Sequence, residues 1–153
     1  MRRRKVIFVV LMALALAGAA GEAAPSQEPG SLTVRDRSGA AVGRIDAHGV
    51  FRDRSGASFG RFDEGAVRDR SGSLLGRIDA DGTIRDRSGA SMGRVEANGT
   101  LRDRSGSLVG RIHEDGTVRN RAGSASGRFD GYLPAHCQVV AAYLFFFDPL
   151  HRR

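Results

Sequence analysis

The chain has little of several residue types that commonly stabilise or functionalise a small protein. It contains one cysteine (Cys137), no tryptophan, four prolines and one lysine (Lys5). A single cysteine cannot form an intramolecular disulfide, so we expect Cys137 to be a small buried apolar residue, with pairing between two chains as the alternative. The longest uninterrupted apolar run covers residues 6–17, which is shorter than the roughly 20 residues of a membrane-spanning helix. These absences exclude an intramolecular disulfide framework and argue against a membrane-spanning helix.

The first 24 residues have the pattern of a secretory signal peptide. A basic segment from Arg2 to Lys5 precedes the apolar run, and small residues between Ala19 and Ala24 offer cleavage sites. We predict a secreted or periplasmic protein, with an uncleaved membrane anchor as the alternative. Without these residues the chain keeps twenty basic and sixteen acidic side chains, a net charge of +4 instead of +7, and every basic residue is an arginine.

A motif recurs six times in the rest of the chain: an apolar residue, RDRSG or a close variant, two or three variable residues, Gly-Arg, an apolar residue, and usually Asp-x-x-Gly. The first arginines of the six copies are separated by 17, 16, 17, 17 and 17 residues. A fixed short period indicates units that cannot fold alone and that bury their apolar sides against one another. The copies begin at Arg35, Arg52, Arg68, Arg85, Arg102 and Arg119.

The Asp-x-x-Gly segments predict three-residue β-hairpin turns that end on a left-handed glycine. With Asp79 and Gly82 bounding such a turn, Ile78 pairs with Ile84 and Arg77 with Arg85, so the isoleucines share one face and the arginines the other. The same register pairs Ile45 with Phe51, Val95 with Leu101, and Ile112 with Val118. The copy at Phe62–Gly65 has lost one residue within this turn, where a deletion is tolerated. Each RDRSG should reverse the chain again, and the glycine of Gly-Arg permits a close approach of the backbone or a bulge.

Five complete hairpins therefore run from Gly43 to Asn120, and a half-repeat remains at each end, at 33–36 and 127–130. These halves can pair and close a ring, which removes exposed strand edges; an open, capped stack is the competing arrangement. The expected fold is all-β, a radial or closed array of short β-hairpins from six repeats of about 17 residues.

The segment Val139–Phe147 is apolar on every side, and Asp148-Pro149 ends it. Such a segment is buried all round, so we expect a plug packed against the array, with docking of a protein partner as the alternative. Pro134 suits a first helical turn, whereas the aromatic run favours a strand, and both remain open. The domain prediction is a signal peptide (1–24), a flexible linker (25–31), the repeat domain (32–131), and the apolar plug with a basic tail (132–153).

The arginines carry the main functional hypothesis. Two series recur, each at a single position of the repeat: the first arginines of the six copies and the arginines of Gly-Arg. In a ring each series would form a belt whose guanidinium groups suit phosphate or carboxylate partners. The alternative is that the arginines pair with the equally periodic aspartates Asp36, Asp53, Asp69, Asp86 and Asp103 and only set register and solubility. The candidate anion-binding residues are Arg44, Arg61, Arg77, Arg94, Arg111 and Arg128.

Other chemistry has little support in the sequence. Calcium needs six to eight converging oxygens, whereas aspartates in such turns usually bond their own backbone. No serine lies in a nucleophile elbow and no histidine pair has metal-ligand spacing. The repeats have no aromatic platform for nucleic-acid bases. We therefore predict no enzyme activity, no cofactor, no metal site and no nucleic-acid partner.

The TVRDRSG and GRIDxDG motifs, the five complete hairpins, the leader and the closing AAYLFFF together resemble the small exported bacterial proteins called 5-fold β-flower proteins. The resemblance covers Leu32 to Phe147 and implies a radial arrangement of hairpins, with no catalytic residues to assign. The chain departs from the family pattern in having no lysine after the leader and in its trailing residues 149–153. The sequence thus predicts a non-catalytic exported protein with a structural or binding role; the alternative is a module that binds anionic envelope or extracellular polymers through its arginines.

Overall fold

The computed structural model describes residues 30–147. The predicted signal peptide, the linker up to residue 29 and the tail from residue 148 lie outside the described residues, and the export prediction depends on them. Within residues 30–147, no helix has the length and apolar character needed to cross a bilayer.

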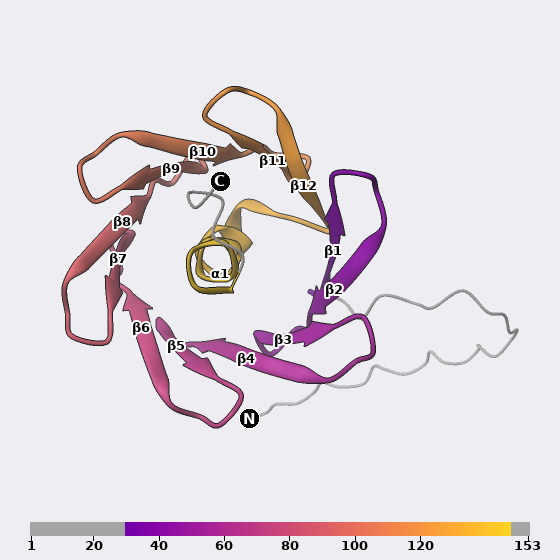
Figure 1. The fold of residues 1–153 in the computed structure, drawn as a ribbon, viewed down its shortest axis with the longest axis horizontal. Helices are drawn as coiled ribbons and strands as arrows, with labels where there is room; N and C mark the ends of the chain where they lie inside the picture. The colour runs from indigo at the N-terminus through magenta and orange to yellow at the C-terminus, as the bar shows by residue number, and fades with distance from the viewer. Residues whose placement is uncertain (1–29, 148–153) are drawn as a thin grey trace, which may run out of the picture.

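Twelve short antiparallel strands form one closed ring, and every strand is hydrogen-bonded to two neighbours (Figure 1). Their order around the ring follows the chain, so each connection is a hairpin turn. The strands are β1 (Leu32–Asp36), β2 (Ala41–Ile45), β3 (Val50–Asp53), β4 (Ser58–Asp63), β5 (Ala66–Asp69), β6 (Leu74–Ile78), β7 (Thr83–Asp86), β8 (Ser91–Val95), β9 (Thr100–Asp103), β10 (Leu108–Ile112), β11 (Thr117–Asn120) and β12 (Ala125–Asp130).

The two half-repeats close the ring. Strand β1 pairs with β12, with Val34 opposite Phe129 and Arg35 opposite Arg128. The complete hairpins place equivalent residues opposite each other, as in Ile78 with Ile84. The prediction of closure is therefore confirmed, and the open stack is wrong. Closure leaves no unpaired strand edge in the described ring.

The Asp-x-x-Gly turns have the predicted geometry. The Asp79 amide donates to the Thr83 carbonyl at 2.8 Å, Gly82 has φ +90°, and Arg77 lies opposite Arg85. The predicted pairs Ile45–Phe51, Val95–Leu101 and Ile112–Val118 are also present.

In the shortened copy, Asp63 pairs directly with Ala66. The deletion therefore lies in the turn itself, as the sequence predicts. The remaining two-residue turn places Glu64 at φ +49° and Gly65 at φ +85°. A two-residue hairpin turn with positive φ at both positions normally carries Asn-Gly or Asp-Gly, so Glu64 occupies a strained position.

The RDRSG turns join the strands at the outer end of each hairpin, and a bulge follows each turn. Between β7 and β8, Ile84 lies opposite Gly93 while Arg85 lies opposite Ser91, so Met92 is the additional residue. The bulge predicted at Gly-Arg is confirmed. Because the additional residue interrupts the alternation, Met92 packs against the core together with its equivalents Val42, Phe59, Leu75 and Val109.

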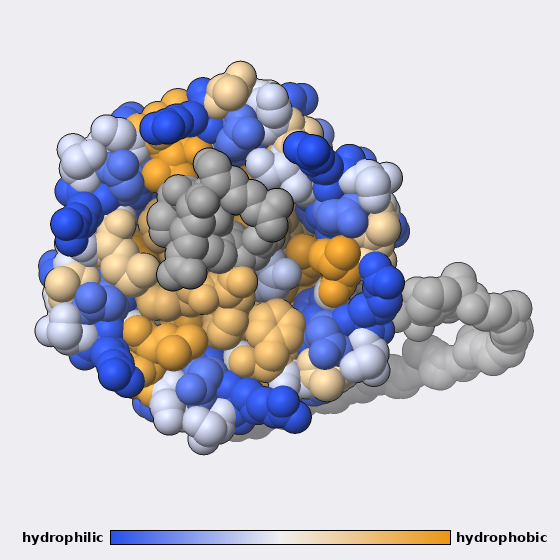
Figure 2. Space-filling view, in the orientation of Figure 1, coloured by the Kyte–Doolittle hydropathy of each residue, from blue (hydrophilic) through white to orange (hydrophobic). Residues whose placement is uncertain are grey.

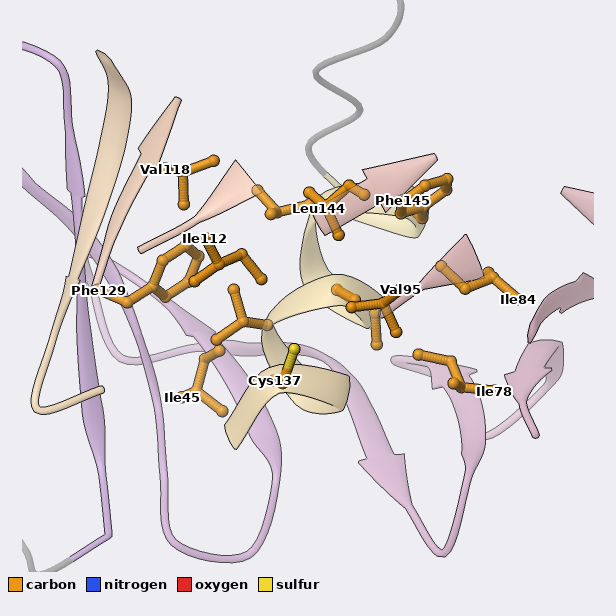
Figure 3. Packing of buried hydrophobic residues seen from close by; sticks show 14 of the residues in the cluster. Ile45, Ile78, Ile84, Val95, Ile112, Val118, Phe129, Cys137, Leu144 and Phe145 are labelled. Atoms are coloured by element: carbon orange, nitrogen blue, oxygen red, sulfur yellow. The ribbon is translucent and has the colours of Figure 1, made fainter. Parts of the chain in front are cut away.

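A helical segment fills the middle of the ring (Figure 1). It consists of a 3₁₀ turn (Pro134–His136), α1 (Cys137–Ala142) and a π-helical turn, η3 (Tyr143–Phe147). Val140, Ala141 and Ala142 are inaccessible to solvent, and the isoleucine and valine side chains of the strands surround the segment (Figure 3). The expectation of a plug is confirmed. The segment is helical because a closed ring offers it no strand edge, whereas a helix satisfies its own backbone hydrogen bonds.

The three phenylalanines of η3 lie against the glycines of three successive Gly-Arg motifs. A methyl group at Gly60, Gly76 or Gly93 would come within 2.4–2.8 Å of the rings of Phe147, Phe146 and Phe145, respectively. Glycine at these positions thus makes room for an aromatic ring directly on the strand backbone.

Candidate functional site

We call two strands joined by an Asp-x-x-Gly turn, or by its shortened form, an inner hairpin. On the inner hairpins arginines alternate with the buried apolar residues, so the arginines lie on the face of the sheet that points away from the helix. Each inner hairpin sets two of them directly opposite each other, as Arg77 opposite Arg85. We call the first series the belt arginines: Arg44, Arg61, Arg77, Arg94, Arg111 and Arg128. We call the second series the turn arginines: Arg35, Arg52, Arg68, Arg85, Arg102 and Arg119.

The turn arginines have a structural task that is the same in all six copies. Each donates from Nη1 to the carbonyl of the glycine four residues later, at 2.8–3.1 Å, as Arg85 does to Gly89. This bond joins the strand to its own outer turn. Part of each turn arginine's hydrogen-bonding capacity is therefore already used within the protein.

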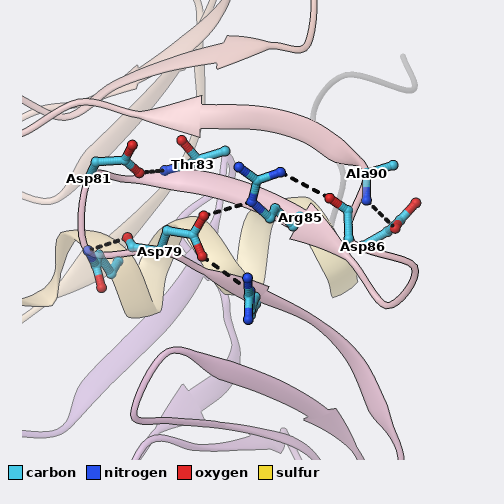
Figure 4. Close-up of polar contacts among 9 residues, drawn as sticks. Asp79, Asp81, Thr83, Arg85, Asp86 and Ala90 are labelled. Carbon is cyan, nitrogen blue, oxygen red and sulfur yellow. Dashed lines mark hydrogen bonds and ion pairs between the residues drawn. The ribbon is translucent and has the colours of Figure 1, made fainter.

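The first residue of the Asp-x-x-Gly turn supplies the carboxylate that neutralises the paired arginines. Asp79 accepts from Arg85 Nε at 2.7 Å and lies 3.2 Å from Arg77 Nε (Figure 4). Asp130 contacts both Arg35 and Arg128 in the same way. The hydrogen bond from Arg85 to Asp79 raises the pKa of Arg85 above its usual value. One carboxylate thus relieves the repulsion between two arginines that face each other.

The equivalent carboxylates on two other hairpins each bind one arginine of the turn series. Arg52 contacts Asp46 at 3.3 Å, and Arg102 contacts Glu96 at 2.6 Å. Their belt partners, Arg44 and Arg94, make no ion pair within residues 30–147.

The sequence-based alternative for the arginines named the wrong partners. Asp86 Oδ1 accepts from the Ser88 hydroxyl at 2.6 Å, the Ser88 amide at 2.8 Å and the Ala90 amide at 3.1 Å. These hydrogen bonds, with that from the Ser88 hydroxyl largest, lower the pKa of Asp86. Asp36, Asp53, Asp69 and Asp103 are held in the same way by their own turns. They stabilise the outer turns instead of pairing with the arginine belt.

The sequence analysis did not identify the carboxylates that pair with the arginines, such as Asp79, although the sequence contained a signal for them. In the predicted register, Asp79 lies at the end of the strand that carries Arg77 and within two positions of it on the same face. That placement brings one carboxylate within reach of both opposed arginines. The aspartates of RDRSG are not placed within reach of both.

The belt arginines are exposed in all six copies. The side chains of Arg61, Arg77 and Arg128 keep 52%, 62% and 57% of their surface accessible even though each contacts one carboxylate. Ion pairs this exposed contribute little to stability, so the belt remains available to other anions.

One hairpin differs from the other five because His113 occupies the position of the carboxylate. Arg111 and Arg119 therefore face each other with no ion pair between residues 30 and 147. The residues around them line a surface hollow of about 540 Å³ that Glu114 and Asp115 also border. Asp115 is engaged by the Thr117 amide at 2.9 Å.

The described residues contain no cluster of three or more His, Cys, Asp or Glu side chains arranged to hold a metal ion. The repeated serine of the outer turns donates its hydroxyl to the neighbouring aspartate, as Ser88 does to Asp86. His136 Nδ1 accepts from the Leu133 amide at 3.0 Å, and burial lowers the pKa of His136.

Cys137 lies buried in α1, with Sγ 3.6 Å from the Glu96 carbonyl. Burial raises the pKa of its thiol. The interpretation of Cys137 as a buried apolar residue is therefore confirmed, and its burial opposes pairing with a second chain.

The family model described as 5-fold beta-flower protein matches residues 31–147, which is almost the whole of the described chain. No curated protein and no solved structure matches the chain significantly.

Proposed function

We propose that this chain, which belongs to the 5-fold beta-flower protein family, is an exported, non-catalytic binding protein whose belt arginines hold anionic polymers of the cell envelope or the extracellular space. A purely structural role in the same compartment is the second candidate, and it is favoured by the extensive use of the turn arginines and aspartates within the fold.

The exposure of the belt supports the binding role most directly. Guanidinium groups recur around the outside of the ring on a rigid backbone, and Arg44, Arg94 and Arg111 have no ion pair within residues 30–147. A polymer with repeated carboxylate, sulfate or phosphate groups can contact several of them at once, which multiplies weak individual attractions. The attraction is electrostatic and is therefore screened by salt.

The test is retention of the full chain on immobilised heparin, a sulfated polyanion, with elution by a salt gradient. Replacing Arg77, Arg94 and Arg111 together by glutamine should move elution to clearly lower salt. The matched control replaces Arg70, Arg87 and Arg104 by glutamine; these exposed arginines lie on outer turns and change the charge equally. Equal shifts in the two triple variants, or no shift in the first, would contradict a role for the belt.

A second variant tests the hairpin in which His113 takes the place of the carboxylate. His113→Asp places a carboxylate between Arg111 and Arg119, as Asp79 lies between Arg77 and Arg85. We expect earlier elution from heparin than for His48→Asp, which introduces the same charge in another turn. Elution at the same salt concentration in both variants would assign the effect to net charge alone.

A further inference from the structure

The sixth copy of the repeat differs from the others at three positions on the hairpin formed by β11, β12 and the turn that joins them. Asn120 replaces aspartate, Ala122 replaces serine, and Ser126 replaces the apolar residue that precedes Gly-Arg. The first five copies place Val42, Phe59, Leu75, Met92 and Val109 at the position of Ser126. Ser126 is the one polar residue among the apolar positions of the six copies.

These three residues line one cavity of about 660 Å³. Ser126 lies between Val42 and Val109, its equivalents on the neighbouring hairpins, and these are the two smallest apolar residues of the series. The cavity exists because three successive bulge positions carry small side chains while the ring keeps its diameter.

The inner side of the cavity is lined by apolar residues. Val34, Val118 and Phe129 form its wall from β1, β11 and β12, and Tyr143 and Leu144 border it from η3. All except Tyr143 are buried. Where the residues drawn in grey do not cover it, the inner part of this face of the ring shows apolar residues, and hydrophilic residues lie around its periphery (Figure 2).

The cavity's rim is charged. Arg37 and Arg121 border the cavity, are exposed, and make no ion pair within residues 30–147. Arg35 also borders it but is committed to Asp130 and to the Gly39 carbonyl.

The carboxylates of Asp36 and Asp103 border the cavity as well, and each accepts hydrogen bonds from its own turn. Asn120 keeps the same turn through bonds from the Ala122 and Ser124 amides at 2.9 and 3.0 Å. The substitution therefore removes a negative charge from the rim without changing the turn.

We propose that this cavity binds a small amphipathic anion, with an apolar body against Val34, Phe129 and Leu144 and an acidic head group at Arg37 and Arg121. Its volume lies within the roughly 300–1,000 Å³ typical of small-molecule sites. Guanidinium groups that make no ion pair within the described part of the chain, beside an apolar space, suit a carboxylate or sulfonate head group. This site is separate from the belt and does not depend on its polymer binding.

The test uses two fluorescent probes with the full chain. 1-Anilinonaphthalene-8-sulfonate is an apolar anion, and N-phenyl-1-naphthylamine is a similar neutral molecule. We expect the anion to bind the native protein more tightly than the neutral probe. Equal affinity would overturn the anionic part of the proposal, and the absence of binding by both probes would overturn the site.

Filling the cavity tests its location. Ser126→Phe introduces the residue that the second copy carries at Phe59, so the repeat accommodates it. We expect this variant to bind the anionic probe at least about tenfold more weakly, because the apolar body loses its space. Ser124→Phe lies on the exposed turn outside the cavity lining and should leave binding unchanged. Should Ser126→Phe fail to fold, Ser126→Leu replaces it, and unchanged binding by the folded variant overturns the proposal.

Removing the rim charge tests the head-group site. Arg37→Gln with Arg121→Gln should weaken binding of the anionic probe at least about tenfold, since hydrogen bonds to charged groups are stronger than those between neutral groups. Binding of the neutral probe should not change. Arg70→Gln with Arg87→Gln, at equivalent positions on other hairpins, is the control with equal net charge. An equal loss for both probes, or an equal loss in the control, would overturn the role of Arg37 and Arg121.

Discussion

The two halves of the ring share one backbone repeat but are filled differently. On β4, β6 and β8, the large residues Phe59, Leu75 and Met92 precede Gly-Arg, and the rings of Phe145, Phe146 and Phe147 cover the glycines. On β10, β12 and β2, the corresponding residues are Val109, Ser126 and Val42, and a methyl group at the glycines would meet only backbone. We call these the packed half and the open half.

The difference shows that one repeat can serve two purposes. The strand pairing repeats around the ring, so the volume of the side chain that precedes Gly-Arg decides whether a hairpin fills the space beside it or leaves a cavity there. The packed half buries aromatic rings against its glycines, and the open half keeps a cavity while its strands remain fully paired.

Deleting a ring from the packed half should have the largest effect. Phe145→Ala is expected to lower the free energy of unfolding by about 3–5 kcal/mol, because the buried ring leaves an empty space against Gly93. Leu144→Ala, beside the existing cavity, should cost only about 2 kcal/mol since it creates no new enclosed void. Urea denaturation measures both, and an equal or larger loss for Leu144→Ala would contradict the division into halves.

Filling the open half should make it resemble the packed half. Ser126→Leu is expected to raise the free energy of unfolding by about 0.5–2 kcal/mol, as cavity-filling substitutions commonly do. The control Ser124→Leu places the same side chain on the exposed outer turn, where the change should stay within about 0.5 kcal/mol. Thermal and urea unfolding report the difference; destabilisation by Ser126→Leu would show that the cavity cannot take a side chain.

The packed half contains one strained turn. Glu64 has φ +49° in the two-residue connection between β4 and β5, and asparagine adopts this conformation more readily. We expect Glu64→Asn to raise the free energy of unfolding by about 0.5–1 kcal/mol. Glu114→Asn, in a three-residue turn without positive φ at that position, is the control. A similar gain in both variants would assign the effect to charge rather than to strain.

The smallest effect concerns acid stability. The pKa of Asp86 is lowered in the folded protein, first by the Ser88 hydroxyl. Its contribution is therefore complete above the pKa of the unfolded chain, about 4, and is lost as pH falls toward the folded pKa. Asp86→Asn copies the Asn120 turn, so its melting temperature should fall less than that of the unchanged protein between pH 5 and pH 2.

Ser88→Ala provides the control for this prediction, since it removes the strongest donor to Asp86. It should reduce the acid sensitivity in the same direction. An unchanged pH slope in Asp86→Asn would show that the turn hydrogen bonds do not favour the charged form.

Most of the hairpin geometry was predictable from the sequence because its causes are local. A left-handed glycine such as Gly82 fixes where the chain reverses, and the alternation of Ile78 with Arg77 fixes which side chains face inward. The location of the deletion, in the turn that contains Glu64, was predictable from the same spacing of aspartate and glycine.

The candidate site was predictable only in part. The belt arginines are exposed, as anion binding by them requires, but the carboxylates assigned to them were wrong because Asp86 has nearer donors in its own turn. The apolar character of Ser126's position was visible, yet its cavity was not, since a cavity depends on the residues of neighbouring hairpins.

The sequence by itself determined the turns, the strand register and the division between apolar and arginine faces, because each depends on residues close together in the chain. Only the tertiary structure decided that Val139–Phe147 is a helix, that the halves at Thr33 and Phe129 join, and that the ring is filled unevenly. These features depend on closure: a ring without free edges excludes an added strand, and the volume inside it is shared among side chains far apart in sequence.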